Sequence, residues 1–364
     1  MAKATDKIQI TLDSGASAEA QAPVIVSASR STDIPAFYAD WFFDRLKRGY
    51  SAWTNPFNGV TSYVSYSRTR FIVFWSKNPR PLLEHLDSLK DKNIQCYIQY
   101  TLNDYEREGL EKGVPPLSQR IETFKLLVDR LGKGRVVWRF DPMILTDKIS
   151  VSDLLDKVRN IGDQLKYYTE KLVFSFADIA SYRKVKVNLE KNGINYIEWD
   201  EATMNEFAEK LSAMNRERGW NFQLATCGEK IDIEQYGIEH NRCVDDDLMI
   251  RFAYQDKELM DFLKVDVKRI QPSAPSMFEE FDDQPTVPSD SVMLTPEQYA
   301  VKKKNNKDKG QRQFCGCIVS KDIGQYNTCP HLCEYCYANT SKEAAVANWN
   351  RHQDNKCSET ITGN

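Results

Sequence analysis

Three cysteines near the C-terminus constrain this chain more than any other feature. Cys329, Cys333 and Cys336 stand at the spacing Cys-x3-Cys-x2-Cys. Thiolates are the usual ligands of iron–sulfur clusters, and three of them can hold three irons of a [4Fe–4S] cube while the fourth iron stays open. Structural zinc is the alternative, but ligand softness and spacing together favour the cluster. For zinc, the candidate fourth ligands are Cys317, His331 and Cys357.

The residues around this triad resemble the radical S-adenosylmethionine (radical SAM) superfamily, including its DNA-repair lyases. The likeness lies in Tyr335 before the third cysteine and in the run Tyr337-Ala338-Asn339-Thr340 after it. In that superfamily the open iron chelates SAM, and an electron from the cluster cleaves SAM to a 5′-deoxyadenosyl radical. The resemblance therefore implies a [4Fe–4S] cluster and SAM as cofactors, with Tyr335, Tyr337 and Asn339 beside them. It also implies an electron donor such as flavodoxin or ferredoxin.

Two features depart from that superfamily. In most members the motif follows the first strand of a barrel, whereas here it is almost the last part of the chain. The chain also lacks a Gly-Gly-Glu-type run, which many members use to hold the amino group of SAM. With four histidines in all, catalysis by histidine is not expected.

Composition narrows the class of protein. The formal net charge is -3 and the pI is about 6.0, so no global positive field draws the chain to nucleic acid. No apolar run approaches the length needed to span a bilayer, and the N-terminus lacks the apolar core of a signal peptide. Nine cysteines without a secretion signal indicate a reducing cytoplasm, where thiols bind metal or do redox chemistry. We expect a cytoplasmic protein with no membrane partner.

Short apolar runs alternate with helical patterns and predict an α/β fold. Continuous apolar runs of this kind are typical of buried parallel strands. The predicted strands are 24–26, 51–53, 71–75, 95–100, 136–140, 172–176 and 222–225, with a weak eighth at 242–244. The predicted helices include 39–46, 117–127, 201–214 and one starting after Ser341. Eight alternating units favour a TIM-type (β/α)-barrel, full or partial, with a C-terminal cysteine-rich cluster-binding segment; a doubly wound sheet is the alternative.

The chain is expected to divide into four parts. Residues 1–22 are small and polar and predict a flexible N-terminal arm. Residues 23–270 form the barrel, 271–310 an extended connection with a basic run, and 311–364 the iron–sulfur cluster segment. The basic run, from Lys302 to Arg312, has three interpretations. We favour a solvated surface segment. The alternatives are a phosphate-binding arm and a counter-charge for an anionic cluster.

Across most of its length the chain resembles a bacterial family known as domain of unknown function 1848. The resembling stretches are 29–35, 75–79, 139–142, 226–229 and 315–339. The resemblance says little about substrate. It reinforces the radical SAM-like interpretation and suggests that Cys227, Cys243, Cys315 and Cys317 belong to the same site as the triad.

Those four cysteines also form a candidate site by themselves. Cys227 is expected at the end of the seventh strand and Cys243 lies 16 positions later, while Cys315 and Cys317 flank a glycine that permits a tight turn. Four thiolates would complete an auxiliary [4Fe–4S] cluster with no open iron. Zinc and unpaired buried thiols are the alternatives. Cys96 lies inside a predicted strand and is expected in the core.

Polar residues follow several predicted strands, at the places where barrel enzymes carry their reactive groups. Arg and Lys there could hold a carboxylate or a phosphate, and Asp and Glu could hold the ribose hydroxyls and the amino group of SAM. Loop caps and surface ion pairs are the alternative roles. The substrate-site candidates are Arg30, Asp33, Lys77, Arg139, Asp141 and Glu229, and Asn55 and Asp178 are further cofactor-binding candidates.

The sequence thus supports three functions. The first is a radical SAM-like enzyme that abstracts hydrogen from an unknown substrate. The second is a nucleic-acid repair or modification protein with the same cluster, which the acidic balance of the chain does not favour. The third is a non-catalytic zinc-binding module.

Overall fold

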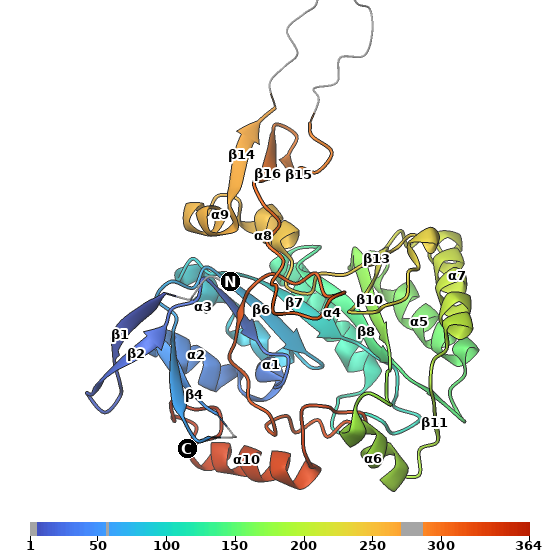
Figure 1. Cartoon of the computed structure of the whole chain (residues 1–364), viewed down its shortest axis with the longest axis horizontal. Helices are drawn as coiled ribbons and strands as arrows, with labels where there is room; N and C mark the ends of the chain where they lie inside the picture. Colours follow the sequence, from blue (N-terminus) through green and yellow to red (C-terminus); the bar gives the residue numbers. More distant parts are fainter. Residues whose placement is uncertain (1–5, 56–57, 271–286) are drawn as a thin grey trace, which may run out of the picture.

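An eight-stranded parallel sheet forms the centre of the structure, a computed structural model that describes residues 6–55, 58–270 and 287–364 (Figure 1). All its neighbouring strands pair in parallel, in the order β13-β12-β10-β8-β7-β6-β3-β17. The strands are β3 (Ile25–Ala28), β6 (Phe71–Ser76), β7 (Gln95–Thr101), β8 (Val136–Met143), β10 (Lys171–Phe176), β12 (Gln223–Thr226), β13 (Ile238–His240) and β17 (Lys321–Asp322).

From β3 to β13 the order in the sheet follows the order in the chain. A doubly wound sheet would instead reverse its order in the middle, so that alternative does not match. Among the strands that the structure describes, no pairing joins β13 to β17, and hydrogen bonds therefore do not close the sheet. The α/β expectation is confirmed, while a closed TIM barrel is not seen.

Helices cover one face of this sheet and form the main core with it (Figure 1). Local signals define their ends: Ser150 and Asp153 make a capping box at the start of α5, Asp200 caps α7, and Gly49 ends α2 with a positive φ of 92°. The helices packed there include α2 (Ala39–Arg48), α4 (Leu117–Leu131), α5 (Val151–Leu165) and α7 (Glu201–Glu217). Shorter helices are α1 (Ile34–Phe37), α3 (Leu86–Asp91), α6 (Arg183–Lys191) and the 3-10 turns Arg80–Glu84 and Glu234–Tyr236.

The other face of the sheet is more polar. Because side chains alternate along a strand, Ser27, Gln99 and Arg139 share this face with apolar Ile25 and Tyr97. Apolar residues of α8 (Asp246–Ala253), α9 (Lys257–Leu263) and the C-terminal tail cover its apolar part as a second core. Buried polar side chains between the sheet and the tail are therefore the natural place for a site.

The C-terminal tail returns to the first strand of the sheet. In β17, Lys321 pairs with Val26 and Asp322 with Ser27. The Asp322 carboxylate also accepts hydrogen bonds from Ser29 Oγ at 2.6 Å and from the Arg30 backbone N–H at 3.0 Å. The chain then continues past the carboxyl ends of the strands to α10 (Lys342–Asp354), which lies below the sheet in Figure 1.

Smaller sheets flank this body. The first, in the order β1-β2-β5-β4, comprises β1 (Lys7–Thr11), β2 (Ser17–Gln21), β5 (Thr61–Ser65) and β4 (Tyr50–Thr54). The second, in the order β14-β16-β15, comprises β14 (Val265–Arg269), β16 (Gln298–Lys302) and β15 (Val292–Thr295). A two-stranded pair joins β9 (Leu145–Thr146) to β11 (Tyr196–Ile197).

These sheets change four expectations. Residues 7–21 form a paired hairpin rather than a loose arm, because Ile8, Ile10 and Ala20 place apolar groups on one face. The predicted strand 51–53 is β4, which lies outside the parallel sheet and pairs antiparallel with β5. The eighth strand is β13 rather than 242–244. The expected connection 271–310 contains two strands, and its residues 271–286 lie outside the described residues.

We predict that Gly113→Ala loosens the docking of the tail. The Gly113 N–H donates to the His331 carbonyl at 3.1 Å, and a Cβ at this position would lie 2.5 Å from that oxygen. Relieving a backbone clash of this kind costs about 1–3 kcal/mol. Urea unfolding and limited proteolysis should show lower stability and new cuts in the tail. In the control Gly310→Ala, the new Cβ would meet only the Asp308 carboxylate at 3.3 Å, so little change is expected. Equal behaviour of the two variants would contradict the prediction.

Candidate iron–sulfur sites

The triad lies on a closed loop at the carboxyl ends of the parallel strands. The Asn327 N–H donates to the Ala338 carbonyl at 3.1 Å, which closes the loop, and Asn339 Nδ2 donates to the Cys329 carbonyl at 2.9 Å. Cys333 is buried, while Cys329 and Cys336 are half-buried. Burial raises the pKa of Cys333 and of Cys336. The loop thus gathers three thiols in a desolvated place where their ionised form needs a metal or a cation.

His331 anchors this loop and does not face the thiols. Its Nε2 lies 2.7 Å from Asp33 Oδ2, and its Nδ1 lies 3.0 Å from the Gly113 carbonyl. Asp33 also accepts from Ser76 Oγ and from the Lys77 backbone N–H. Both residues are therefore occupied in holding the loop, and the side chain of Asp33 has no free oxygen for a ligand.

A buried polar cluster lies beside the triad loop. Lys77 Nζ lies 2.8 Å from Glu111 Oε1 and 2.9 Å from the Tyr335 hydroxyl, which also bonds to Glu111. Asn103 Nδ2 donates to both Glu111 and Tyr335. Burial alone would raise the pKa of Glu111, but the charges of Lys77 and Arg120 outweigh it and hold the pKa at about 2. Glu111 is therefore an anion that holds Lys77 and Tyr335 in place.

The other four cysteines come together on the polar face of the sheet. Cys227 follows β12, and its Sγ lies 3.3 Å from Cys243 Sγ. The Cys317 thiol interacts with those of Cys243 and Cys315. Contact with the Cys227 and Cys317 thiols, together with the Arg139 guanidinium, lowers the pKa of Cys243. The structure thus brings these four cysteines together, as expected. Cys96 lies apart from them in the main core, also as expected.

Two arginines lie beside this second group. Arg139 Nη1 donates to Cys243 Sγ at 2.9 Å, and its Nη2 pairs with Asp141. The charges of Cys317 and Cys243 counteract the burial of Arg30, so that its pKa is raised. Both guanidinium groups lie near the Trp75 ring, Arg30 at 5.3 Å and Arg139 at 5.2 Å from its centroid. Positive charge therefore accompanies the thiols in a region that excludes water.

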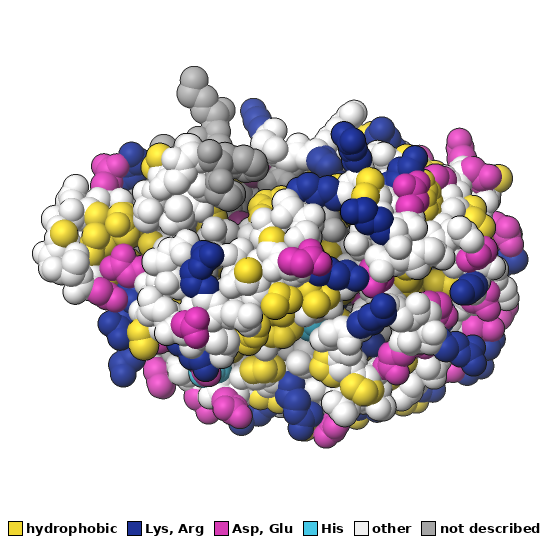
Figure 2. Space-filling model, turned by 90° about the horizontal axis from the view of Figure 1, so that it is seen from below, with side chains coloured by type: hydrophobic (Ala, Val, Ile, Leu, Met, Phe, Trp, Pro, Cys, Tyr) yellow, Lys and Arg dark blue, Asp and Glu magenta, His cyan; other side chains and the backbone are white. Residues whose placement is uncertain are grey.

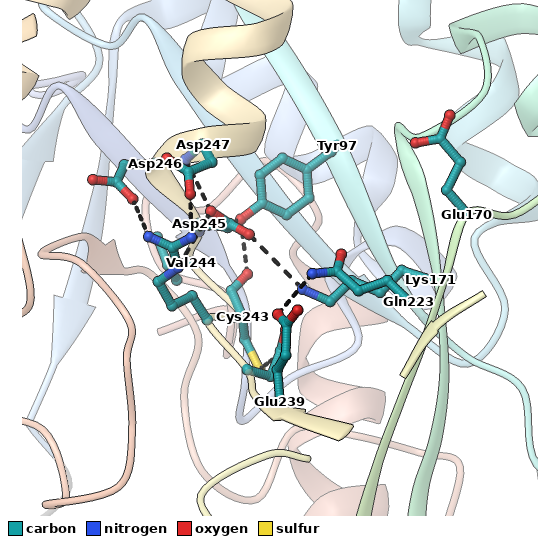
Figure 3. A network of polar contacts seen from close by, with 12 residues as sticks. Tyr97, Glu170, Lys171, Gln223, Glu239, Cys243, Val244, Asp245, Asp246 and Asp247 are labelled. Atoms are coloured by element: carbon teal, nitrogen blue, oxygen red, sulfur yellow. Dashed lines mark hydrogen bonds and ion pairs between the residues drawn. The ribbon is translucent and has the colours of Figure 1, made fainter. Parts of the chain in front are cut away.

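The sheet also holds the backbone of Cys243. Its carbonyl accepts from the Tyr97 hydroxyl at 2.7 Å and from Gln99 Nε2 at 2.8 Å, and the Asp245 N–H donates back to the Tyr97 hydroxyl (Figure 3). The carboxylates of 245–247 lie together beyond this point, but Arg242 and Lys302 neutralise them. This acidic group therefore positions the cysteine loop.

Two carboxylates and two tyrosines lie near the thiol groups. Asp141 bonds to Arg139 and Ser175, and Glu229 accepts from the Phe176 N–H at 2.9 Å. Burial raises the pKa of Glu229 to about 7. The Tyr337 hydroxyl donates to the Arg30 carbonyl, and its ring lies 6.0 Å from that of Tyr182.

Two of the cofactor-binding candidates, Asp178 and Asn55, have a role or a position other than the expected one. Asp178 accepts from the Ser181 N–H and hydroxyl, so it caps the turn before α6. Asn55 follows β4 in the sheet β1-β2-β5-β4, and this correction removes it from the carboxyl edge of the eight-stranded parallel sheet. A strand's sheet cannot be assigned from its apolar pattern alone, which is why Asn55 was grouped with the others.

Sequence reasoning missed Glu111, Asn103 and Asp322. Glu111 and Asn103 lie in the loop between β7 and α4, where three other acidic residues occur and nothing in the sequence distinguishes the buried one. Asp322 lies two positions before Gly324 in the tail. A Cβ on Gly324 would lie 1.8 Å from Ser29 Oγ. That glycine was the available signal of a close approach.

The basic run has ordinary partners. Lys302 pairs with Asp247 at 2.6 Å, Lys303 pairs with Asp266 at 2.8 Å, and Lys307 Nζ donates to the Gln313 carbonyl. These contacts agree with the favoured interpretation of a surface segment. Arg312, at the end of the run, instead lies near the Cys227 and Cys315 thiols, as the counter-charge interpretation expects. None of the described helices is long and apolar enough to cross a membrane.

Comparison with known proteins yields one match. The model of the family described as "Domain of unknown function (DUF1848)" matches residues 25–338, which include both thiol groups. No curated protein and no solved structure matches the chain.

We predict that Glu111→Gln destabilises the protein by about 3 kcal/mol, because Lys77 and Arg120 would keep buried positive charge without their carboxylate. Urea unfolding measures the difference. The folded-state pKa of Glu111, about 2, lies below its ordinary value of 4.5. The advantage of the wild type should therefore be complete above pH 4.5 and shrink as the pH falls toward 2.

The matched control is Glu19→Gln, at the exposed Lys7–Glu19 pair. Exposed pairs contribute about 0–1 kcal/mol. A loss at Glu111 no larger than the loss at Glu19 would show that the buried cluster does not hold the loop.

Proposed function

The chain belongs to the DUF1848 family, and from this premise we propose that it is a radical SAM-like enzyme. Cys329, Cys333 and Cys336 would hold a [4Fe–4S] cluster whose open iron binds SAM. When bound, that group supplies reductive cleavage of SAM to a 5′-deoxyadenosyl radical, which abstracts hydrogen from a substrate. The substrate is not assigned, and a flavodoxin or ferredoxin would supply the electron.

The observation that carries the proposal is a set of three thiols on one loop. Of the residues considered as a fourth protein ligand, His331 uses both ring nitrogens elsewhere. Cys357 is exposed and lies beyond α10. Three thiolates and one open iron are the arrangement that lets a small molecule bind the cluster.

Three thiols also favour a cluster over zinc, because a structural zinc site takes four protein ligands.

The surrounding residues would divide into supports and ligand contacts. Asp33, Lys77 and Glu111 hold the loop and leave few free atoms. Asp141 and Glu229 could accept hydrogen bonds from the ribose hydroxyls and amino group of SAM. Arg30 could hold its carboxylate, and Tyr337 and Asn339 could contact its adenine ring.

The architecture is consistent with this function. Sequential parallel strands bring all their carboxyl ends to one edge, as in the (β/α)-barrels that radical SAM enzymes use. We propose that the sheet is a partial barrel of this type. The tail strand β17 would bring the cluster loop to the edge where other members carry it after their first strand.

No observation favours the nucleic-acid alternative. The basic run is engaged in ion pairs and backbone contacts. On the face seen in Figure 2, hydrophobic side chains gather near the middle, and basic and acidic side chains are interspersed around them. Nucleic-acid surfaces instead show a continuous basic patch.

We predict that Cys329→Ala, Cys333→Ala and Cys336→Ala each abolish reductive cleavage of SAM. Each thiolate holds one iron, so the variants should also lose about four irons per chain while they remain folded. The measurements are 5′-deoxyadenosine formation with dithionite and iron and sulfide content after anaerobic purification. Cys357→Ala is the control, since its thiol is exposed. Unchanged 5′-deoxyadenosine formation in the triple variant would refute the proposal.

A further inference from the structure

A second group of buried thiols lies outside the triad, and no step proposed above requires it. We propose that Cys227, Cys243, Cys315 and Cys317 hold a closed [4Fe–4S] centre, with Arg139 as its buried counter-ion. This goes beyond the function proposed for the triad, and it does not depend on that function. Its basis is the convergence of thiols and cations on one face of the sheet.

The four thiols come from three separate parts of the chain. Cys227 ends β12, Cys243 precedes α8, and Cys315 and Cys317 belong to the tail. Cys243 and Cys317 are each 2% exposed, and the Cys227 and Cys243 sulfurs are 3.3 Å apart. Buried cysteines are usually scattered apolar side chains, so four that converge across this sequence distance need a common reason.

The backbone is shaped to bring these sulfurs together. The Ile318 N–H donates to the Val244 carbonyl at 3.0 Å, which lays the tail beside the Cys243 loop. Between Cys315 and Cys317, a Cβ on Gly316 would lie 2.5 Å from the Arg242 side chain and 3.3 Å from the Asn241 carbonyl. A glycine is therefore required where the two thiols turn toward the sheet.

Hydrogen-bond donors directed at the cysteine sulfurs indicate that these sulfurs act as thiolates. The Val244 N–H lies 3.3 Å from Cys317 Sγ, and Asn241 Nδ2 lies 3.1 Å from Cys243 Sγ. Hydrogen bonds from amides to sulfur are a common feature of iron–sulfur centres and help to set their reduction potentials. Neutral core thiols need no such partners.

The buried charge of Arg139 also indicates that the sulfurs beside it are thiolates. Its side chain is 3% exposed and contacts Cys243 at one end and Asp141 at the other. Burying a guanidinium is costly unless anions surround it, and Asp141 is also shared with Ser175. Thiolates on a cluster would add negative charge beside that of Asp141. Arg30, which also lies over the Trp75 ring, adds a second cation.

The ligand set also defines the kind of centre. Four thiolates fill every iron of a [4Fe–4S] cube, so this centre has no place for SAM. Four thiolates can also hold a single zinc ion, and metal analysis of the purified protein separates the two centres. The centre would hold the tail against the sheet and could exchange electrons without binding substrate.

The test uses the Cys329, Cys333 and Cys336 triple alanine variant, because any iron left in it reports on the second group alone. We predict about four irons per chain in this variant after anaerobic reconstitution, and close to none when Cys227→Ala or Cys243→Ala is added. Cys96→Ala, in the main core of the same sheet, is the control and should keep the iron. The added cysteine variants should also show new proteolytic cuts between Ser289 and Asp322, because metal ligation links the tail to the sheet.

Each outcome bears on one proposal. No iron in the triple variant, or zinc in its place, overturns the second centre and leaves the triad proposal standing. Full iron after Cys227→Ala, with an unchanged digestion pattern, shows that Cys227 is not a ligand and also overturns the proposal. If the triple variant keeps its iron while SAM cleavage is absent even in the wild type, the second centre stands and the triad proposal fails.

The role of Arg139 is tested in the same triple variant by redox titration of the remaining cluster. Arg139→Gln removes the positive charge and should make the midpoint potential more negative, whereas Arg139→Lys should largely restore it. Arg30→Gln, at a less buried position, should shift the potential in the same direction. This variant replaces Arg139→Gln in the test if Arg139→Gln does not fold. An unchanged potential in the folded Gln variants would show that neither arginine is a counter-ion of the centre.

Discussion

The pairing of a two-residue strand, β17, with β3 is the interaction on which both thiol groups depend. It joins residues almost three hundred positions apart, and the Asp322 carboxylate strengthens it by accepting from Ser29 and Arg30. Before this strand the tail carries Cys315 and Cys317, and after it comes the triad loop. Two residues of strand pairing contribute little free energy by themselves. The contacts on both sides of β17 must therefore help to offset the conformational entropy that the tail loses when it becomes ordered.

Buried charge is the second organising constraint. Lys77 faces Glu111 under the triad, while Arg139 and Arg30 face the other four cysteines. Cations are costly inside a protein unless anions accompany them. Under the triad a carboxylate meets this need, whereas at the second group Asp141 and the thiols share it. The cations of the second group are therefore paired with sulfur as well as with oxygen.

Much of the fold followed from local patterns. The apolar runs at 71–75, 95–100 and 136–140 became neighbouring parallel strands, and Ser341 began α10 as its capping chemistry predicts. The strand at 51–53 was misplaced, because an apolar run carries no information about which sheet it joins. The hairpin at 7–21 was missed because its strands are short and half exposed, with few large apolar side chains.

The sequence by itself determined the chemistry of the candidate sites: which residues are thiols, how the triad is spaced, and where a glycine allows a turn. Only the tertiary structure decided which groups share a place. It joined Cys227 to Cys243 and the tail, paired Arg139 with a sulfur, and turned His331 away from the thiols toward Asp33. The physical reason is that ligand type is a local property of the chain, whereas burial and charge compensation depend on distant segments that meet only in the folded protein.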